Sequence, residues 1–89
     1  QLGLKTACVE KEKTLGGTCL NVGCIPSKCL LESSHLYSHL LHAGKTHGVE
    51  ATPTLNFAQM MQRKNDVVAG FNVGIQGLFK KNKVTSIAG

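Results

Sequence analysis

Two cysteines, Cys19 and Cys24, are separated by four residues in the stretch GGTCLNVGCIPSK, residues 16–28. Such a pair can form a structural disulfide, supply half of a metal site, or act as a dithiol that gains and loses electrons. A disulfide across so short a loop removes only about 2 kcal/mol of entropy from the unfolded chain. A structural role therefore gains little, and metal binding and redox chemistry remain to be compared.

Metal binding is one interpretation of the pair. Cys19, Cys24, His35 and His39 follow the spacing C-x4-C-x10-H-x3-H, which lies within the broad Cys2His2 zinc pattern. His35 and His39 share one helix face, and the net charge of +5 would suit nucleic acid. A zinc finger, however, places its cysteines on a hairpin ahead of its helix, whereas here the expected helix follows Cys24 almost directly. A zinc-dependent nucleic-acid-binding module is therefore the alternative hypothesis.

Redox chemistry accounts for more of the same stretch. The positive end of a helix dipole stabilises a thiolate, and Cys24 stands just before the expected helix start at Pro26. Lys28, one turn further on, adds positive charge. Cys19 lies on the loop ahead of the helix, where an incoming sulfur could reach it. The residue types and their order therefore favour a reactive dithiol.

The residues ahead of the cysteines suit a nucleotide cofactor. Gly16 and Gly17 allow the backbone to approach a ligand closely, and their amides could hold a phosphate together with the Thr18 hydroxyl. Glu10 ends the first expected strand, where nucleotide-binding sheets place the acid that holds ribose hydroxyls. In this order the signals predict a dithiol beside a nucleotide cofactor.

The elements that must position these residues alternate between strand and helix. We predict a strand over 4–10, a redox loop over 16–25, helices over 26–42 and 55–79, and a strand over 83–88. Strands joined through helices are normally parallel neighbours, which predicts an α/β fold: a strand–helix–helix–strand slice of a partial doubly wound parallel sheet. The expected buried face of the second helix consists of Phe57, Met61, Val68, Phe71, Ile75 and Leu78.

Composition limits how much structure the chain can stabilise alone. With 89 residues, no Trp, one Tyr and three Phe, it is expected to bury about 60–65% of its unfolded surface around a modest core. No apolar run approaches the roughly 20 residues that span a bilayer, so we expect no membrane partner. The chain begins without Met and ends on a strand, and we interpret it as a fragment of a larger domain.

The stretch GGTCLNVGCIPSK resembles the redox-active segment of the pyridine nucleotide–disulfide oxidoreductases. Leu20 after the first cysteine and IPSK after the second resemble the dihydrolipoamide dehydrogenase members of that family, as do QLGLKTACVEK and GLFKKNKV. The resemblance extends over nearly all of the chain and covers part of one domain. It implies that residues 1–89 form a partial FAD-binding domain with a Rossmann-like sheet.

By this resemblance, Cys19 is the interchange thiol that meets the lipoyl sulfur, and Cys24 is the thiol against the flavin. Glu10 would bind the adenosine ribose of FAD, and Lys28 would lie near the flavin ring. The complete set implied in FAD binding is Glu10, Lys11, Leu15, Gly16, Gly17, Thr18, Cys19, Cys24 and Lys28. We expect the two cysteines to form a disulfide with their α-carbons about 4.4–6.8 Å apart.

The implied reaction is the oxidation of a protein-bound dihydrolipoyl dithiol, with electrons passing through the disulfide and FAD to NAD+. The implied partners are the lipoyl domains of 2-oxo acid dehydrogenase or glycine cleavage complexes, and a second subunit in a homodimer; no nucleic acid or membrane is implied. The expected location is the mitochondrial matrix in a eukaryote or the cytoplasm in a bacterium. The resemblance assigns no metal.

Several features set limits on the resemblance. Cys29 stands where relatives usually carry alanine, and FNVGIQG replaces a stretch that usually carries paired glycines. The nicotinamide domain, the dimerisation domain and the histidine base of a second subunit would lie outside the 89 residues, and no histidine of this chain is assigned to that base. We therefore expect the isolated chain to be inactive. A truncated, inactive gene product is a third interpretation.

Overall fold

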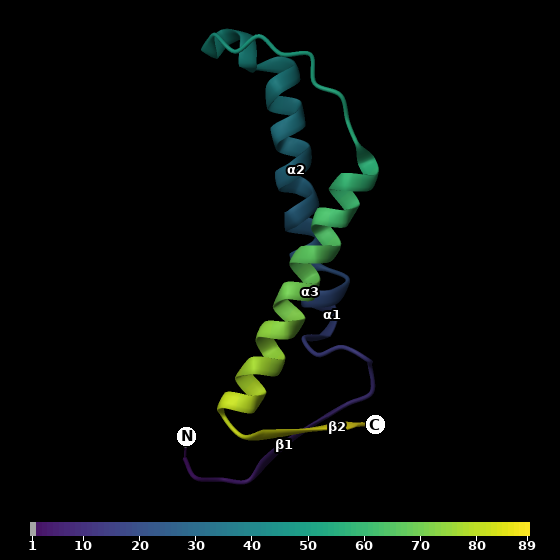
Figure 1. Cartoon of the computed structure of the whole chain (residues 1–89), viewed down its shortest axis with the longest axis vertical. Helices are drawn as coiled ribbons and strands as arrows, with labels where there is room; N and C mark the ends of the chain where they lie inside the picture. The colour runs from purple at the N-terminus through teal and green to yellow at the C-terminus, as the bar shows by residue number, and fades with distance from the viewer. Residues whose placement is uncertain (1) are drawn as a thin grey trace.

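The structure, a computed structural model, describes residues 2–89 as a long helical hairpin with a small sheet at one end (Figure 1). The elements follow in the order β1 (Thr6–Glu10), α1 (Gly17–Asn21), α2 (Cys24–His42), the 3₁₀ helix η1 (Gly44–His47), α3 (Phe57–Lys81) and β2 (Val84–Ala88). The mixed helix and strand content agrees with the predicted α/β class.

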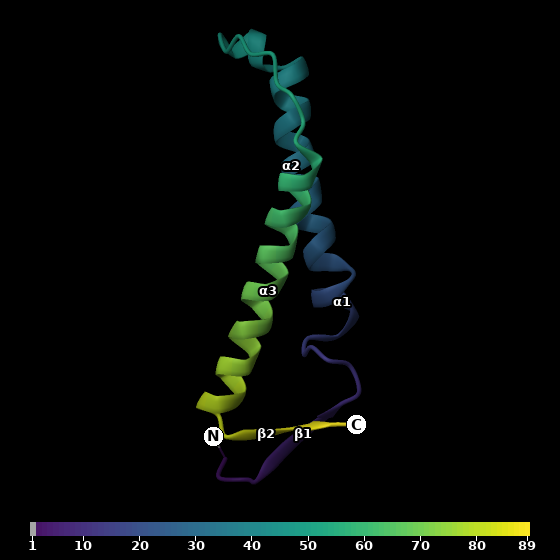
Figure 2. The ribbon, with the colours of Figure 1, turned by 45° about the vertical axis from the view of Figure 1, so that its right-hand side comes forward.

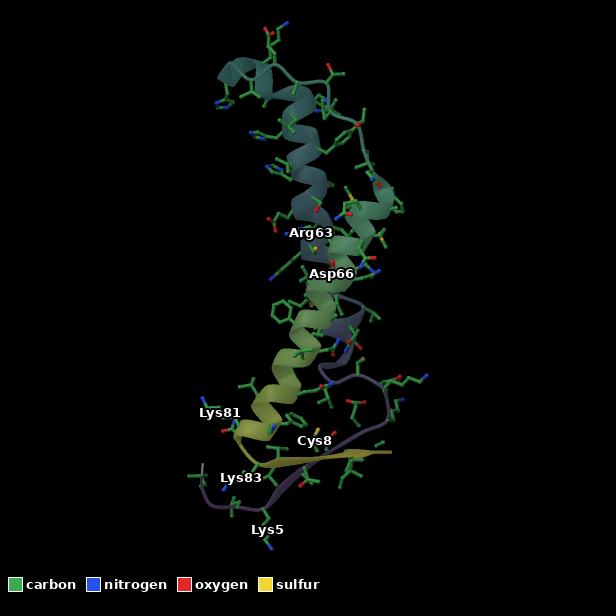
Figure 3. The ribbon with its side chains drawn as sticks, viewed as in Figure 1. Lys5, Cys8, Arg63, Asp66, Lys81 and Lys83 are labelled. Carbon is green, nitrogen blue, oxygen red and sulfur yellow. The ribbon has the colours of Figure 1, made fainter. Side chains whose placement is uncertain are left out.

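The two strands form a parallel pair, in which Thr6 lies opposite Val84 and Glu10 opposite Ala88. This confirms the prediction that the first and last strands are parallel neighbours. Parallel neighbours need a long crossover connection, and α1, α2 and α3 supply it here. The half-buried side chain of Cys8 lies on the side of the sheet that faces α3 (Figure 3). Val9 points to the opposite face, because successive side chains of a strand alternate, and it is 64% exposed.

The boundaries around the cysteines differ from the predicted loop over 16–25. Residues 17–21 form the short helix α1, and α2 begins at Cys24, two residues before the predicted start at Pro26. Pro26 occupies the third position of α2, and its missing N–H costs nothing there because the first four N–H groups of a helix have no partner within it. The chain between α1 and α2 is a tight link, in which Val22 and Gly23 both donate backbone N–H groups to the carbonyl of Thr18.

The buried face predicted for the second helix is partly wrong. Phe57, Phe71 and Leu78 are 63%, 49% and 57% exposed, and no residue of α3 is fully buried. Met61, Val68 and Ile75 of the predicted face are half-buried, and Asn72 and Phe79 are half-buried with them. The spacing of apolar residues shows which faces of a helix could be buried, but not which face another element covers. Here α2, α1 and the sheet cover only one side of α3.

The interior of the structure is small. Among residues 2–89, the buried residues are Leu20, Pro26, Cys29 and Gly44, and Leu20 and Cys29 are 9% and 6% exposed. The radius of gyration is 18.8 Å, whereas a compact domain of this length has a value of about 12 Å. The accessible surface is 7158 Å², about 2,100 Å² more than a compact monomer of this mass exposes. Figure 2, turned from the first view, shows the same narrow hairpin, in which no further element of residues 2–89 packs against the outer sides of α2 and α3.

No helix within residues 2–89 combines the length and the apolar character needed to cross a membrane.

Candidate redox site

The two cysteines of the central stretch lie on consecutive helices. Cys19 is in the middle of α1 and Cys24 is the first residue of α2, and both are exposed. Both are free thiols, so the structure holds the pair as a dithiol and the predicted disulfide is not formed. A pair of nearby cysteines can be a dithiol or a disulfide, because the exchange of two electrons and two protons converts one state into the other. The structure therefore describes the reduced state of the pair.

The two thiols interact. A side-chain hydrogen bond with Cys24 is the largest cause that raises the pKa of the Cys19 thiol, and desolvation and the charge of Cys24 act in the same direction. A backbone hydrogen bond from Cys24 and the positive charge of Lys28 lower the pKa and so oppose the rise. The balance favours a protonated Cys19, which is the state that can donate a hydrogen bond to its neighbour.

The start of α2 leaves its positive end available to the dithiol. Its N-cap, Gly23, makes no side-chain capping bond, and the first turn carries no acidic residue. The free N–H groups and the helix dipole therefore favour negative charge beside Cys24. A β-carbon at Gly23 would lie 3.2 Å from the carbonyl oxygen of Thr18, so glycine lets the end of α1 and the start of α2 meet closely.

A groove of about 540 Å³ lies beside α1, between its first turn and the chain that leaves β1. It brings together four of the residues implied in cofactor binding, Glu10, Lys11, Gly17 and Thr18. Gly17 has a φ of 70°, and no atom lies within 4 Å of the position that a β-carbon would take. The Glu10 carboxylate accepts the Glu12 N–H at 3.1 Å and so lies over its own loop. The groove offers the carboxylates of Glu10 and Glu12, the amine of Lys11 and open backbone at Gly17.

Three other residues of the implied set lie outside this groove. Leu15 is half-buried and lines a separate hollow of about 340 Å³ beside Phe79 and the end of β2. Gly16 is the N-cap of α1, with a φ of 109°. Lys28 is exposed in the first turns of α2, where its charge acts on Cys19. None of these three residues lines the groove.

Asn21, to which the sequence patterns assigned no role, anchors the segment between the cysteines. Its side-chain Nδ2 donates to the carbonyl of Leu15 at 3.1 Å and to that of Gly17 at 2.9 Å. Thr14 and Asn72 donate to its Oδ1 at 2.9 and 3.2 Å. An asparagine beside glycines is a recognisable signal for local side-chain bonds to the backbone, although that signal does not name the partner on α3.

The zinc hypothesis is not supported. His35 and His39 do lie on one face of α2, with ring centroids 5.2 Å apart, and His39 lies 6.2 Å from His47. Cys24 is the first residue of that helix and Cys19 lies before it on α1, and eleven residues at 1.5 Å per residue separate Cys24 from His35 by about 16 Å. Zinc requires all of its ligands within about 2.3 Å. Within residues 2–89 no group of three or more His, Cys, Asp or Glu side chains could hold a metal ion.

No protein-family model matches the chain. Individual proteins do match it across its whole length. The chain is 54% identical to leghemoglobin reductase of Vigna unguiculata and 54% identical to the mitochondrial dihydrolipoyl dehydrogenase of Pisum sativum, each over 90 aligned positions that include 100% of the chain. It is 57% identical to dihydrolipoyl dehydrogenase 3 of Pseudomonas putida, again over 100% of the chain. Over its whole length, the chain is similar to one segment of the dihydrolipoamide dehydrogenases.

This similarity to dihydrolipoamide dehydrogenases confirms the resemblance inferred from GGTCLNVGCIPSK. The chain spans 17% to 19% of the length of these three relatives, less than a fifth of each. A segment of that size agrees with the small interior and the large exposed surface of the structure. Most of a dihydrolipoamide dehydrogenase therefore lies outside the residues described here.

Proposed function

We propose that this chain supplies the redox-active dithiol of a dihydrolipoamide dehydrogenase, in which Cys19 and Cys24 alternate between dithiol and disulfide. The observation that carries the proposal is the placement of two exposed thiols on consecutive helices at the uncapped start of α2, next to the groove that holds Glu10 and Gly17. The names of relatives that match the whole chain support the same assignment.

The residues of the groove fit the nucleotide part of FAD. Glu10 stands at the carboxyl end of β1, where a carboxylate can accept hydrogen bonds from ribose hydroxyls. Gly17 presents backbone without a side chain, Thr18 adds a hydroxyl and Lys11 adds positive charge, all of which suit a diphosphate. We assign the cofactor contacts of this chain to Glu10, Lys11, Gly17 and Thr18, with Gly16 and Leu15 in support. When bound, FAD would accept two electrons and pass them to NAD+.

The chain's own residues carry the exchange of sulfur bonds. In the oxidised pair, a dihydrolipoyl thiolate attacks Cys19, a new S–S bond forms to Cys19, and Cys24 leaves as a thiolate at the start of α2. The second lipoyl sulfur then attacks its partner, which closes the lipoyl disulfide and releases Cys19 with its electron pair. The lipoyl group loses two electrons, and the pair of cysteines gains them. Lys28 and the α2 dipole stabilise the negative charge that this leaves.

The partners and the location follow from the same assignment. The substrate would be a lipoyl group carried by a domain of a 2-oxo acid dehydrogenase or glycine cleavage complex, and the whole enzyme would be a homodimer. No residue of the 89 is assigned to NAD+. The relative in Pisum sativum is named mitochondrial, and another relative is bacterial, so we place the protein in the mitochondrial matrix of a eukaryote or in the cytoplasm of a bacterium.

The test is steady-state NAD+ reduction by dihydrolipoamide, measured with the full natural protein and with the variants Cys19→Ser and Cys24→Ser. Each substitution removes one sulfur of the exchange, so we expect the rate to fall by more than about a thousandfold, as the loss of a catalytic nucleophile does elsewhere. Cys8→Ser is the matched control, because Cys8 lies on β1 away from the dithiol. Equal activity of Cys24→Ser and wild type would contradict the proposal.

A further inference from the structure

Asn21, between the two cysteines, uses its whole capacity for hydrogen bonding. An amide side chain has two N–H donors and two acceptor lone pairs. Its Nδ2 donates to the carbonyls of Leu15 and Gly17, and its Oδ1 accepts from the hydroxyl of Thr14 and from Nδ2 of Asn72. Four bonds thus hold one side chain, and through it the segment that carries Cys19.

Asn72 is the one member of this network that comes from a distant part of the chain, 51 residues away on α3. Its Nδ2 also donates to the carbonyl of Val68 at 3.1 Å, which fixes the side chain against its own helix. Its Oδ1 is buried and has no hydrogen-bond partner among residues 2–89. The side chain therefore incurs a desolvation cost while it directs its donor at Asn21.

The position of Asn21 gives this contact a consequence for the dithiol. Asn21 is two residues after Cys19 and three before Cys24. It is the last residue of α1, which carries Cys19, and the tight Val22–Gly23 link joins it to Cys24 at the start of α2. Holding two reacting groups near each other raises the effective concentration of one relative to the other, because less freedom is lost when the bond forms. Loss of a hydrogen bond to Asn21 should therefore disfavour formation of the Cys19–Cys24 disulfide.

We propose that Asn72 is a positioning residue, which acts through Asn21 to favour disulfide formation between Cys19 and Cys24. This inference rests on the proposed redox role of the pair and adds to it a contribution from α3. Asn72 touches neither sulfur in the network described and is not assigned to the substrate or the cofactor. Its effect is on the equilibrium between the dithiol and the disulfide.

The experiment equilibrates the full natural protein, without dihydrolipoamide or NAD+, in glutathione buffers. Cys19 and Cys24 lose two electrons and two protons as their S–S bond forms, and one glutathione disulfide becomes two glutathione thiols.

Alkylation stops the exchange, and trypsin cleavage after Lys13 and Lys28 leaves both cysteines on one peptide, residues 14–28. The fraction of that peptide with two alkyl groups gives the equilibrium constant. Asn72→Ala should lower the constant for disulfide formation at least about threefold, the usual effect of one lost hydrogen bond.

Asn82→Ala is the matched control. Asn82 lies at the end of the same helix and makes the same kind of bond, from Nδ2 to the carbonyl four residues earlier at 3.0 Å, but it has no bond to Asn21. The equilibrium constant for disulfide formation in Asn82→Ala should equal that of the wild type within about 1.5-fold. Asn21→Ala should lower the constant as well, and Asn72→Ala should add no further shift in that background, because coupled residues are not additive.

Three results would overturn the proposal: an unchanged or raised constant for Asn72→Ala, an equal shift in Asn82→Ala, or a full shift of Asn72→Ala in the Asn21→Ala background. If Asn72→Ala does not fold, the exposed Thr14→Ala decides, since Thr14 donates to the same oxygen of Asn21. Thr14→Ala should lower the constant, and no change would overturn the proposal. Because the equilibrium uses only glutathione, the expected shifts in a protein that reduced no NAD+ would contradict the proposed function alone.

Discussion

The guanidinium of Arg63 on α3 donates from Nη1 to the sulfur of the buried Cys29 on α2, at 3.0 Å. The same nitrogen reaches the carbonyl oxygen of Cys29 at 3.4 Å and the hydroxyl of Ser33 at 3.3 Å. Figure 3 shows Arg63 where the two helices lie side by side. Cys29 is thus one half of a contact between the two long helices.

Replacement of Arg63 by Ala should lower the free energy of unfolding by about 1–2 kcal/mol, because the variant loses several bonds at a partly buried site. Glu32→Gln is the comparison, since Glu32 pairs with the same guanidinium at 3.6 Å but is 75% exposed. An exposed ion pair contributes about 0–1 kcal/mol, so Glu32→Gln should cost less than Arg63→Ala. Urea unfolding of the full natural protein measures both. A larger loss in Glu32→Gln would show that the ion pair, and not the contact with Cys29, joins the helices.

Gly16→Ala tests the start of α1. Gly16 has a φ of 109°, and a β-carbon there would lie 2.8 Å from Cδ1 of the buried Leu20. Gly48 also has a positive φ, 77°, but its β-carbon would meet nothing within 4 Å. Both variants should carry the backbone cost of about 1–2 kcal/mol, and Gly16→Ala should add about 1–3 kcal/mol of overpacking. Equal losses in the free energy of unfolding would show that Leu20 yields to the added methyl.

Alkylation of Cys19 should depend on its neighbours with opposite signs. Cys24→Ala removes the hydrogen bond and the charge that raise the pKa of Cys19, so at about pH 8 more thiolate is present and iodoacetamide should react faster. Lys28→Gln removes a positive charge that lowers the same pKa, so Cys19 should react more slowly. Rates are read from modification at residue 19 over a range of pH. A slower Cys19 in Cys24→Ala would show that Cys24 does not hold the proton on its neighbour.

The parts of the fold and site that the sequence predicts are those marked by a regular pattern or a compact motif. The pairing of β1 and β2 follows from two short apolar runs separated by helices, and the cysteines follow from a compact motif. The helix α1 escapes prediction because GTCLN contains one large apolar residue, Leu20, and no periodicity. The burial of Phe57, Phe71 and Leu78 was predicted wrongly because burial depends on which other segments cover a helix face.

Contacts between distant segments form the second limit. Asn21 meets Asn72 across 51 residues, and Arg63 meets Cys29 across 34. Neither pair has a spacing that marks it, since the geometry of the α2–α3 hairpin determines which turns face each other. Electrostatic reasoning from the motif likewise identified Lys28 as a charge near the dithiol, but not that the interaction between the thiols would raise the pKa of Cys19.

The 89 residues in isolation should reduce no NAD+ with dihydrolipoamide, even when FAD is added. Two strands seldom form an independently stable sheet, and the chain exposes far more surface than a compact domain of its size. The dihydrolipoyl dehydrogenase of Pisum sativum with its matching segment exchanged for this chain supplies the remaining residues. That chimera should turn over. Activity of the isolated chain above a no-protein control would show that fewer parts are needed than we propose.

The central claim is that the Cys19–Cys24 pair passes electrons from a dihydrolipoyl group to NAD+. Anaerobic treatment of the full natural protein with one equivalent of dihydrolipoamide, followed by alkylation, should place two alkyl groups on peptide 14–28. Addition of NAD+ before alkylation should instead return the peptide to its disulfide and release one NADH per pair, because two electrons leave the two sulfurs. A peptide that remains doubly alkylated after NAD+, or NADH formed while the pair stays reduced, would contradict the claim.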